Sequence, residues 1–104
     1  MADVRAAGKL GEALAGIAKN TQRIPSASGA AAYRIPDILD AGTKTIGEVK
    51  NLNGTLSFTS QIKDDLAYAQ QNGYQMVLKV SQSTQFSQPL QQVINSGAIT
   101  VVRF

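Results

Sequence analysis

Apolar residues recur along the first half of the chain with spacings that change from segment to segment. In residues 4–20 they lie three and four positions apart, which indicates a helix with one apolar face. Residues 21–32 are rich in turn-forming types and predict a loop. Residues 33–39 and 45–51 have the composition of strands. The turn residues at 40–43 predict that these strands pair as a hairpin.

Polar breaks divide the next part of the chain in the same way. Asn53 and Gly54 signal a tight hairpin turn before a short strand at 56–58. Thr59 or Ser60 can cap a helix that runs to about residue 72, where Gly73 ends it.

The C-terminal part begins with residues 74–80, whose apolar run predicts a strand buried on both faces. A short helix follows at 86–95, with Pro89 in its first turn, and residues 99–104 form a last strand. The expected order is therefore α-β-β-β-α-β-α-β, a mixed α/β fold whose central sheet is flanked by helices.

The length of 104 residues fits one domain, divided into a first helix (1–20), a loop (21–32) and a core (33–104). Ten Lys and Arg against seven Asp and Glu give a net charge of +3, which suits an anionic partner such as nucleic acid. The chain contains neither His nor Cys. This absence excludes a His-based metallonuclease, a ribonuclease that works through a His pair, a zinc finger and a cysteine hydrolase.

Two carboxylates and one ammonium group mark the two paired strands. Asp37 follows Pro36, which implies a strand edge, a bulge or a bend, and hairpin pairing can bring Asp37 beside Glu48. Glu48 and Lys50 share one face of their strand, and Val49 should point to the core on the other. Two carboxylates and the Val49 carbonyl suit Mg²⁺ or Mn²⁺ better than Zn²⁺.

Several residues of this candidate site have a second interpretation. Asp40 lies three residues after Asp37 and can replace it, and an exposed Glu and Lys on a hairpin surface need no function. Gln61, Asp65 and Tyr68 share one face of the expected helix, on which Gln61 is either a substrate contact or a solvated polar residue.

Three runs of this sequence, at residues 33–37, 47–51 and 56–64, resemble the restriction-endonuclease-fold toxin domains at the C-termini of bacterial polymorphic toxins. Residues 20–26 are similar to that family's linker after its first helix, and residues 90–99 to its tail. The resemblance implies the PD-(D/E)XK nuclease fold and metal-dependent cleavage of nucleic acid. It places Asp37, Glu48 and Lys50 at the three core motif positions.

The resemblance also implies further partners and residues. Glu12 is similar to a helical acidic residue that often joins the metal in this fold, although it can equally be a surface residue paired with Lys9. Gln61 matches a glutamine that the fold commonly places against the site. The family is delivered into rival cells as the C-terminal part of a larger exported protein, acts in their cytoplasm and is matched by a dedicated immunity protein. No membrane binding is expected of this domain itself.

Basic side chains can extend the site along a phosphate backbone, and the candidates are Lys19, Arg23, Arg34 and Lys63, with Asn51 after the motif lysine. Each can also be an ordinary solvated residue. The leading hypothesis is a nuclease toxin that cleaves DNA with low sequence specificity, because a small chain has little room to read sequence. The alternatives are an RNase of the same fold that cleaves tRNA and a nucleic-acid-binding module without catalysis.

Overall fold

A mixed sheet of four strands organises the protein, whose structure is a computed structural model that describes residues 20–104. The strand order is β1-β2-β4-β6, with β1 antiparallel to β2 and the other neighbours parallel. The strands span β1 Ile38–Asp40, β2 Thr45–Lys50, β4 Gln75–Val80 and β6 Ile99–Arg103. This arrangement confirms the mixed α/β fold expected from the sequence.

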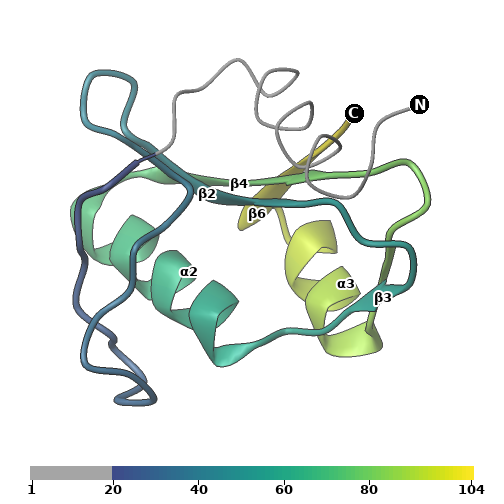
Figure 1. Ribbon diagram of the computed structural model, residues 1–104, viewed down its shortest axis with the longest axis horizontal. Helices are drawn as coiled ribbons and strands as arrows, with labels where there is room; N and C mark the ends of the chain where they lie inside the picture. The colour runs from purple at the N-terminus through teal and green to yellow at the C-terminus, as the bar shows by residue number, and fades with distance from the viewer. Residues whose placement is uncertain (1–19) are drawn as a thin grey trace.

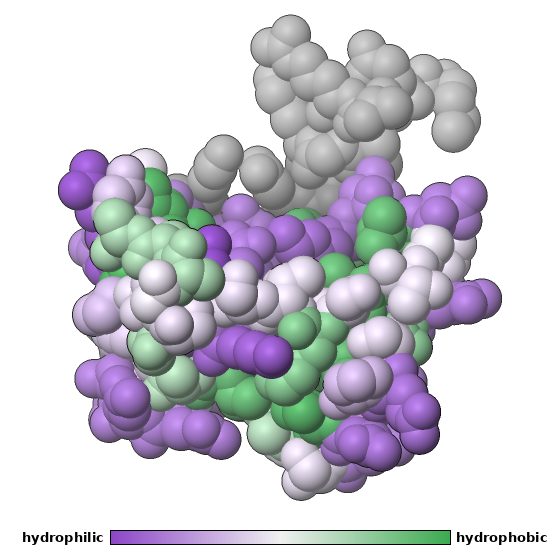
Figure 2. Space-filling view, turned by 90° about the horizontal axis from the view of Figure 1, so that it is seen from below, coloured by the Kyte–Doolittle hydropathy of each residue, from purple (hydrophilic) through white to green (hydrophobic). Residues whose placement is uncertain are grey.

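Both described helices lie on the same face of the sheet, as Figure 1 shows. Helix α2, Ser60–Asn72, packs on β2 and β4, while α3, Gln88–Asn95, packs on β6. The core fills the layer between helices and sheet. Its buried side chains are Ile24, Ile46, Leu56, Ile62, Ala69, Met76, Leu78, Val80, Leu90 and Ile99. On the helix side, the space-filling view shows apolar surface bordered by hydrophilic side chains (Figure 2).

Helix α2 begins and ends where its sequence predicts. The Thr59 hydroxyl accepts a hydrogen bond from the Ile62 N–H at 3.2 Å and so satisfies one of the unpaired N–H groups of the first turn. Gly73 adopts a left-handed conformation with φ of 69° and donates its N–H to the Ala69 carbonyl. These two caps fix which residues of α2 face the sheet.

The hairpin of β1 and β2 is confirmed, but β1 is shorter than the expected strand at 33–39. Its register pairs Ile38 with Gly47 and Asp40 with Thr45. Before Pro36, Arg34 forms only an isolated antiparallel bridge with Ile24. Proline has no N–H to donate, so the ladder cannot continue through it.

The hairpin expected at Asn53 and Gly54 is wrong. Strand β3, Thr55–Leu56, pairs in parallel with β5, Gln85–Phe86, in a separate two-stranded sheet. The Gly54 carbonyl accepts from the Gln85 N–H at 2.8 Å, a contact between residues far apart in sequence. The same pairing delays the start of α3 from residue 86 to Gln88.

The helix expected over residues 4–20 lies outside the described residues, apart from Asn20, which is not helical. In residues 20–104, no helix is long and apolar enough to cross a membrane.

Gly47 is the point at which β2 and β4 leave no room for a side chain. A Cβ there would overlap the carbonyl oxygen of Val77, which is backbone and cannot rotate away. We predict that Gly47→Ala lowers the free energy of unfolding by about 1–3 kcal/mol. Gly42→Ala is the control, since its Cβ would meet only the exposed side chain of Asp40. Urea unfolding measures the stability of both variants. Equal stabilities would contradict the close approach of β2 and β4 at Gly47.

Candidate functional site

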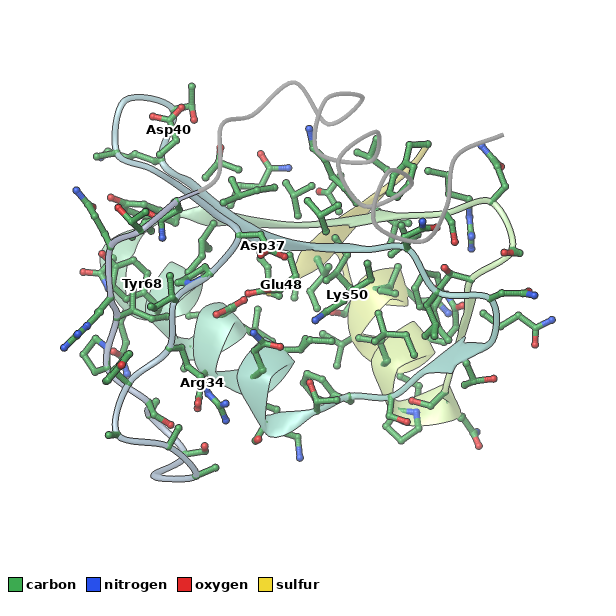
Figure 3. All side chains as sticks on the ribbon, in the orientation of Figure 1. Arg34, Asp37, Asp40, Glu48, Lys50 and Tyr68 are labelled. Atoms are coloured by element: carbon green, nitrogen blue, oxygen red, sulfur yellow. The ribbon has the colours of Figure 1, made fainter. Side chains whose placement is uncertain are left out.

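Glu48 lies under α2 rather than on a solvent-facing strand surface. It is 1% exposed, and it shares a face of β2 with Ile46, a core residue. Lys50 follows on the same face, as the spacing predicts. The expectation that Val49 points to the main core is wrong, because the cluster of buried side chains between the sheet and the helices lies on the Glu48 side and Val49 is only half-buried. Figure 3 shows Glu48 and Lys50 between the sheet and the helices.

Asp37 is held against β2 just before β1 begins. Its Oδ2 accepts a hydrogen bond from the Val49 N–H at 2.9 Å, as expected if Asp37 lies opposite Glu48. Asn20 fixes the approach, since its N–H donates to the Asp37 carbonyl and its Nδ2 to the Pro36 carbonyl. Because the N–H and C=O of one strand residue point to the same side, the Val49 carbonyl also faces this edge.

Gln61, in the first turn of α2, bridges the two motif residues of β2. Its Oε1 accepts from Lys50 Nζ at 3.3 Å, and its Nε2 donates to Glu48 Oε1 at 3.5 Å. The structure therefore brings Asp37, Glu48, Lys50 and Gln61 together, as expected from the sequence. The amide of Gln61 holds the ammonium group and the carboxylate in a fixed relation, since its oxygen and nitrogen each have a partner.

Asp65 is a member of this cluster that the sequence analysis did not select. It lies one turn after Gln61 on the same face of α2, is fully buried, and meets the carboxyl group of Glu48. The available signal was its i+4 spacing from Gln61. Tyr68, also on that face, instead packs edge-on against Tyr74, with ring centroids 5.3 Å apart.

The acidic groups raise one another's proton affinity. Burial, then the carboxyl group of Asp65 and the charge of Asp37, hold the pKa of Glu48 far above its usual range. Burial also raises the pKa of Asp65. The carboxyl group of Glu48, where it carries the proton, opposes that rise in the pKa of Asp65, and the charges of Asp37 and Asp64 add to it. Without a cation, this cluster therefore retains protons that isolated carboxylates would lose.

The donor set of this cluster fits a hard divalent cation. Glu48 Oε2 and both carboxylate oxygens of Asp65 are buried without a hydrogen-bond donor. Within residues 20–104, no three acidic side chains converge as a complete metal site by themselves. Mg²⁺ does not need such a set, because it commonly takes one or two carboxylates and keeps several waters or phosphate oxygens. Glu48, Asp37 and the Val49 carbonyl are the oxygen donors expected from the sequence.

Arg34 forms an ion pair with a buried carboxylate, and its phosphate-binding role stays a prediction. Its Nε donates to Asp64 Oδ2 at 2.8 Å, and its Nη2 donates to Ser60 Oγ at 2.9 Å. Asp64 also accepts from the Ser26 hydroxyl at 2.6 Å and the Ser28 N–H at 2.8 Å. Burial by itself would raise the pKa of Asp64, but these hydrogen bonds outweigh it and hold the pKa well below its usual range.

The remaining candidates lie away from these contacts or outside the described residues. The Arg23 guanidinium lies 4.1 Å from the ring centroid of Tyr33, and the Lys63 ammonium lies 5.3 Å from that of Phe58. Both residues are exposed, as is Asn51 directly after β2, so their phosphate-binding role stays a prediction. Glu12 and Lys19 lie outside the described residues.

Asp40, the alternative to Asp37, is the last residue of β1 and faces solvent. Its carboxylate accepts from the Gly42 and Thr43 N–H groups and so stabilises the turn. These contacts give Asp40 a local structural role and leave Asp37 as the carboxylate opposite Glu48.

Comparison with known protein families gives a match over most of the chain. The family model described as restriction endonuclease fold toxin 7 matches residues 8–90, which is most of the chain. The match includes β1, β2, α2 and β4, and therefore every residue of the cluster described above. No curated protein and no solved structure matches significantly.

The Arg34–Asp64 pair should contribute to folding. We predict that Arg34→Met lowers the free energy of unfolding by about 3 kcal/mol, because it leaves a buried carboxylate with only Ser26 and Ser28 as donors. Arg23→Met is the matched control, with a loss of about 1 kcal/mol or less. Thermal and urea unfolding compare the two. If Arg34→Met were as stable as the wild type but bound nucleic acid more weakly, a phosphate-contacting role would replace the structural one.

Proposed function

This chain belongs to the restriction endonuclease fold toxin 7 family, and on that premise we propose that it is a metal-dependent nuclease toxin that hydrolyses DNA. The family supports a nuclease toxin. DNA as the substrate, the requirement for Mg²⁺ or Mn²⁺ and low sequence specificity are parts of the proposal.

One observation carries the proposal. Glu48 is buried with an unpartnered carboxylate oxygen, lies beside Asp37 and shares a face of β2 with Lys50. A buried carboxylate without a donor destabilises a fold, so its presence needs a compensating partner. A divalent cation bound on an oxygen donor set supplies that partner. The same constellation on an exposed hairpin surface would have left both side chains solvated.

The metal, when bound, would polarise a water and offset phosphate charge. Glu48, Asp37 and the Val49 carbonyl are the groups of this chain that would hold it. One oxygen of Asp37 is already fixed by the Val49 N–H, which leaves its second oxygen for this purpose. This anchoring limits the motion of the Asp37 carboxylate before substrate arrives.

Lys50 would act on the phosphodiester itself. Its ammonium group can orient the attacking water and stabilise the negative charge that develops on the phosphorus oxygens. Gln61 is a positioning residue, because its amide oxygen accepts from Lys50 Nζ and its amide nitrogen donates to Glu48. Substrate phosphate would compete with Gln61 for the ammonium group and draw Lys50 towards the reacting centre.

Delivery and control are further parts of the proposal. We propose that this domain is carried by a larger exported toxin and acts inside a target cell. We expect a cognate immunity protein that covers the acidic site or presents acidic side chains to the basic surface residues. Purified immunity protein should therefore block cleavage in a mixing assay. An immunity protein that binds tightly and leaves cleavage unchanged would contradict this mode of protection.

Purified protein incubated with supercoiled plasmid and, separately, with total RNA tests the proposal. We predict plasmid nicking or degradation that requires Mg²⁺ or Mn²⁺, stops with EDTA and leaves no discrete fragment pattern. Lys50→Ala should reduce the cleavage rate by about 10²–10³-fold, because the negative charge that develops on the phosphate in the transition state would no longer be stabilised by the Lys50 ammonium group. Cleavage of RNA but not of plasmid would contradict the DNase proposal and favour an RNase of the same fold.

Glu48→Gln is the second variant in this assay. Gln has the shape of the protonated Glu48 that burial and the neighbouring carboxyl groups favour, so the apoprotein should remain as stable as the wild type while cleavage is lost. A folded Glu48→Gln variant that cleaves at the wild-type rate would exclude Glu48 from the site.

A further inference from the structure

Asp65 is buried in a way that the fold alone does not explain. It is fully buried in the middle of α2, and neither of its carboxylate oxygens receives a hydrogen bond from any described donor. Removing a carboxylate from water without donors is costly, so a buried carboxyl group is normally protonated, paired with a cation or bound to a metal.

The surroundings of Asp65 indicate what that partner is. Glu48 meets it from β2, close enough for a hydrogen bond when one of the two carboxyl groups is protonated, and Asp37 and Lys50 are its other charged neighbours in the cluster. Glu48 Oε2 is likewise buried and without a donor. Three carboxyl oxygens without a hydrogen-bond donor, on two facing elements, therefore border one place.

The preceding residue shows how this chain satisfies a carboxylate that serves folding. Asp64 is equally buried, yet it accepts hydrogen bonds from Arg34, Ser26 and Ser28. Two adjacent aspartates in one helix thus have opposite environments. Asp64 faces a cation and donors from the 24–34 segment, whereas Asp65 faces Glu48.

We propose that Asp65 is a ligand of the catalytic cation, so that α2 contributes a carboxylate opposite Glu48 of β2. This inference rests on the proposed metal-dependent nuclease function and adds a residue to its site. One oxygen from each carboxylate with waters and substrate phosphate makes a donor set of the kind that Mg²⁺ and Mn²⁺ prefer. The cation also joins α2 to the sheet at the turn next to Gln61.

Binding of Mn²⁺ to the purified protein, measured by calorimetry and by electron paramagnetic resonance without nucleic acid, tests the inference. The decisive variant is Asp65→Asn, whose amide can still donate a hydrogen bond to Glu48 but lacks the anionic oxygen. Asp40→Asn is the matched control, since it removes one exposed carboxylate from the end of β1. Circular dichroism and a thermal melt of each variant establish that it is folded.

Mutating a residue that only supports a metal ligand typically lowers metal affinity by about 10–100-fold. Asp65→Asn would remove a direct ligand, so we expect it to weaken Mn²⁺ binding at least about tenfold. Asp40→Asn should bind as the wild type does. If the wild type and Asp65→Asn bind Mn²⁺ equally while Glu48→Gln does not, Asp65 is only a hydrogen-bond partner of Glu48 and the inference is overturned. If the wild type binds no Mn²⁺ at millimolar concentration, both the inference about Asp65 and the proposed metal-dependent function are overturned.

Discussion

The facing carboxyl groups of Glu48 and Asp65 set the central constraint on this structure. Both are buried between β2 and α2, and both retain oxygens without a donor. Burial of like charges costs free energy, so the surrounding fold has to supply the stability that holds them together. The sheet and the capped α2 supply it through core side chains on either side of the pair, among them Ile46 and Ile62. The site is thus destabilised locally within a layer that is otherwise well packed.

Within residues 20–104, the other buried polar side chains have hydrogen-bond partners except for the Ser87 hydroxyl, so the Glu48 and Asp65 pair is the one acidic exception. Arg34 and two serines neutralise Asp64, and Arg103 donates to the carbonyls of Ser81, Gln82 and Thr84. Each of these contacts ties a loop to a regular element. The helix N-terminus that Arg34 anchors through Ser60 is the turn that carries Gln61. A structural ion pair therefore positions the residue that bridges Glu48 and Lys50.

The sequence predicted what local spacing determines. Thr59 and Gly73 set the limits of α2, and the turn after Asp40 predicted the pairing that brings Asp37 opposite Glu48. Contacts between distant residues were not predictable in this way. Strand β3 pairs with β5, about thirty residues later in the chain, and the composition of β3 does not predict which strand it pairs with. The inward face of β2 was misassigned because apolar residues occupy both alternations, Ile46 on one face and Val49 on the other. Asp65 was placed on the same helix face as Gln61 but was not assigned to the site, because aspartate is rarely buried unless it has a partner.

The central claim is that the buried carboxylates form a cation site from which a phosphodiester is cleaved. A crystal structure determined in the presence of Mn²⁺, with anomalous scattering data at the manganese edge, tests it most directly. The account predicts an anomalous peak in contact with Glu48, between β2 and α2 and within reach of Asp37. Ordered Mn²⁺ bound only elsewhere on the molecule, with the Glu48 carboxyl group unliganded, would contradict it.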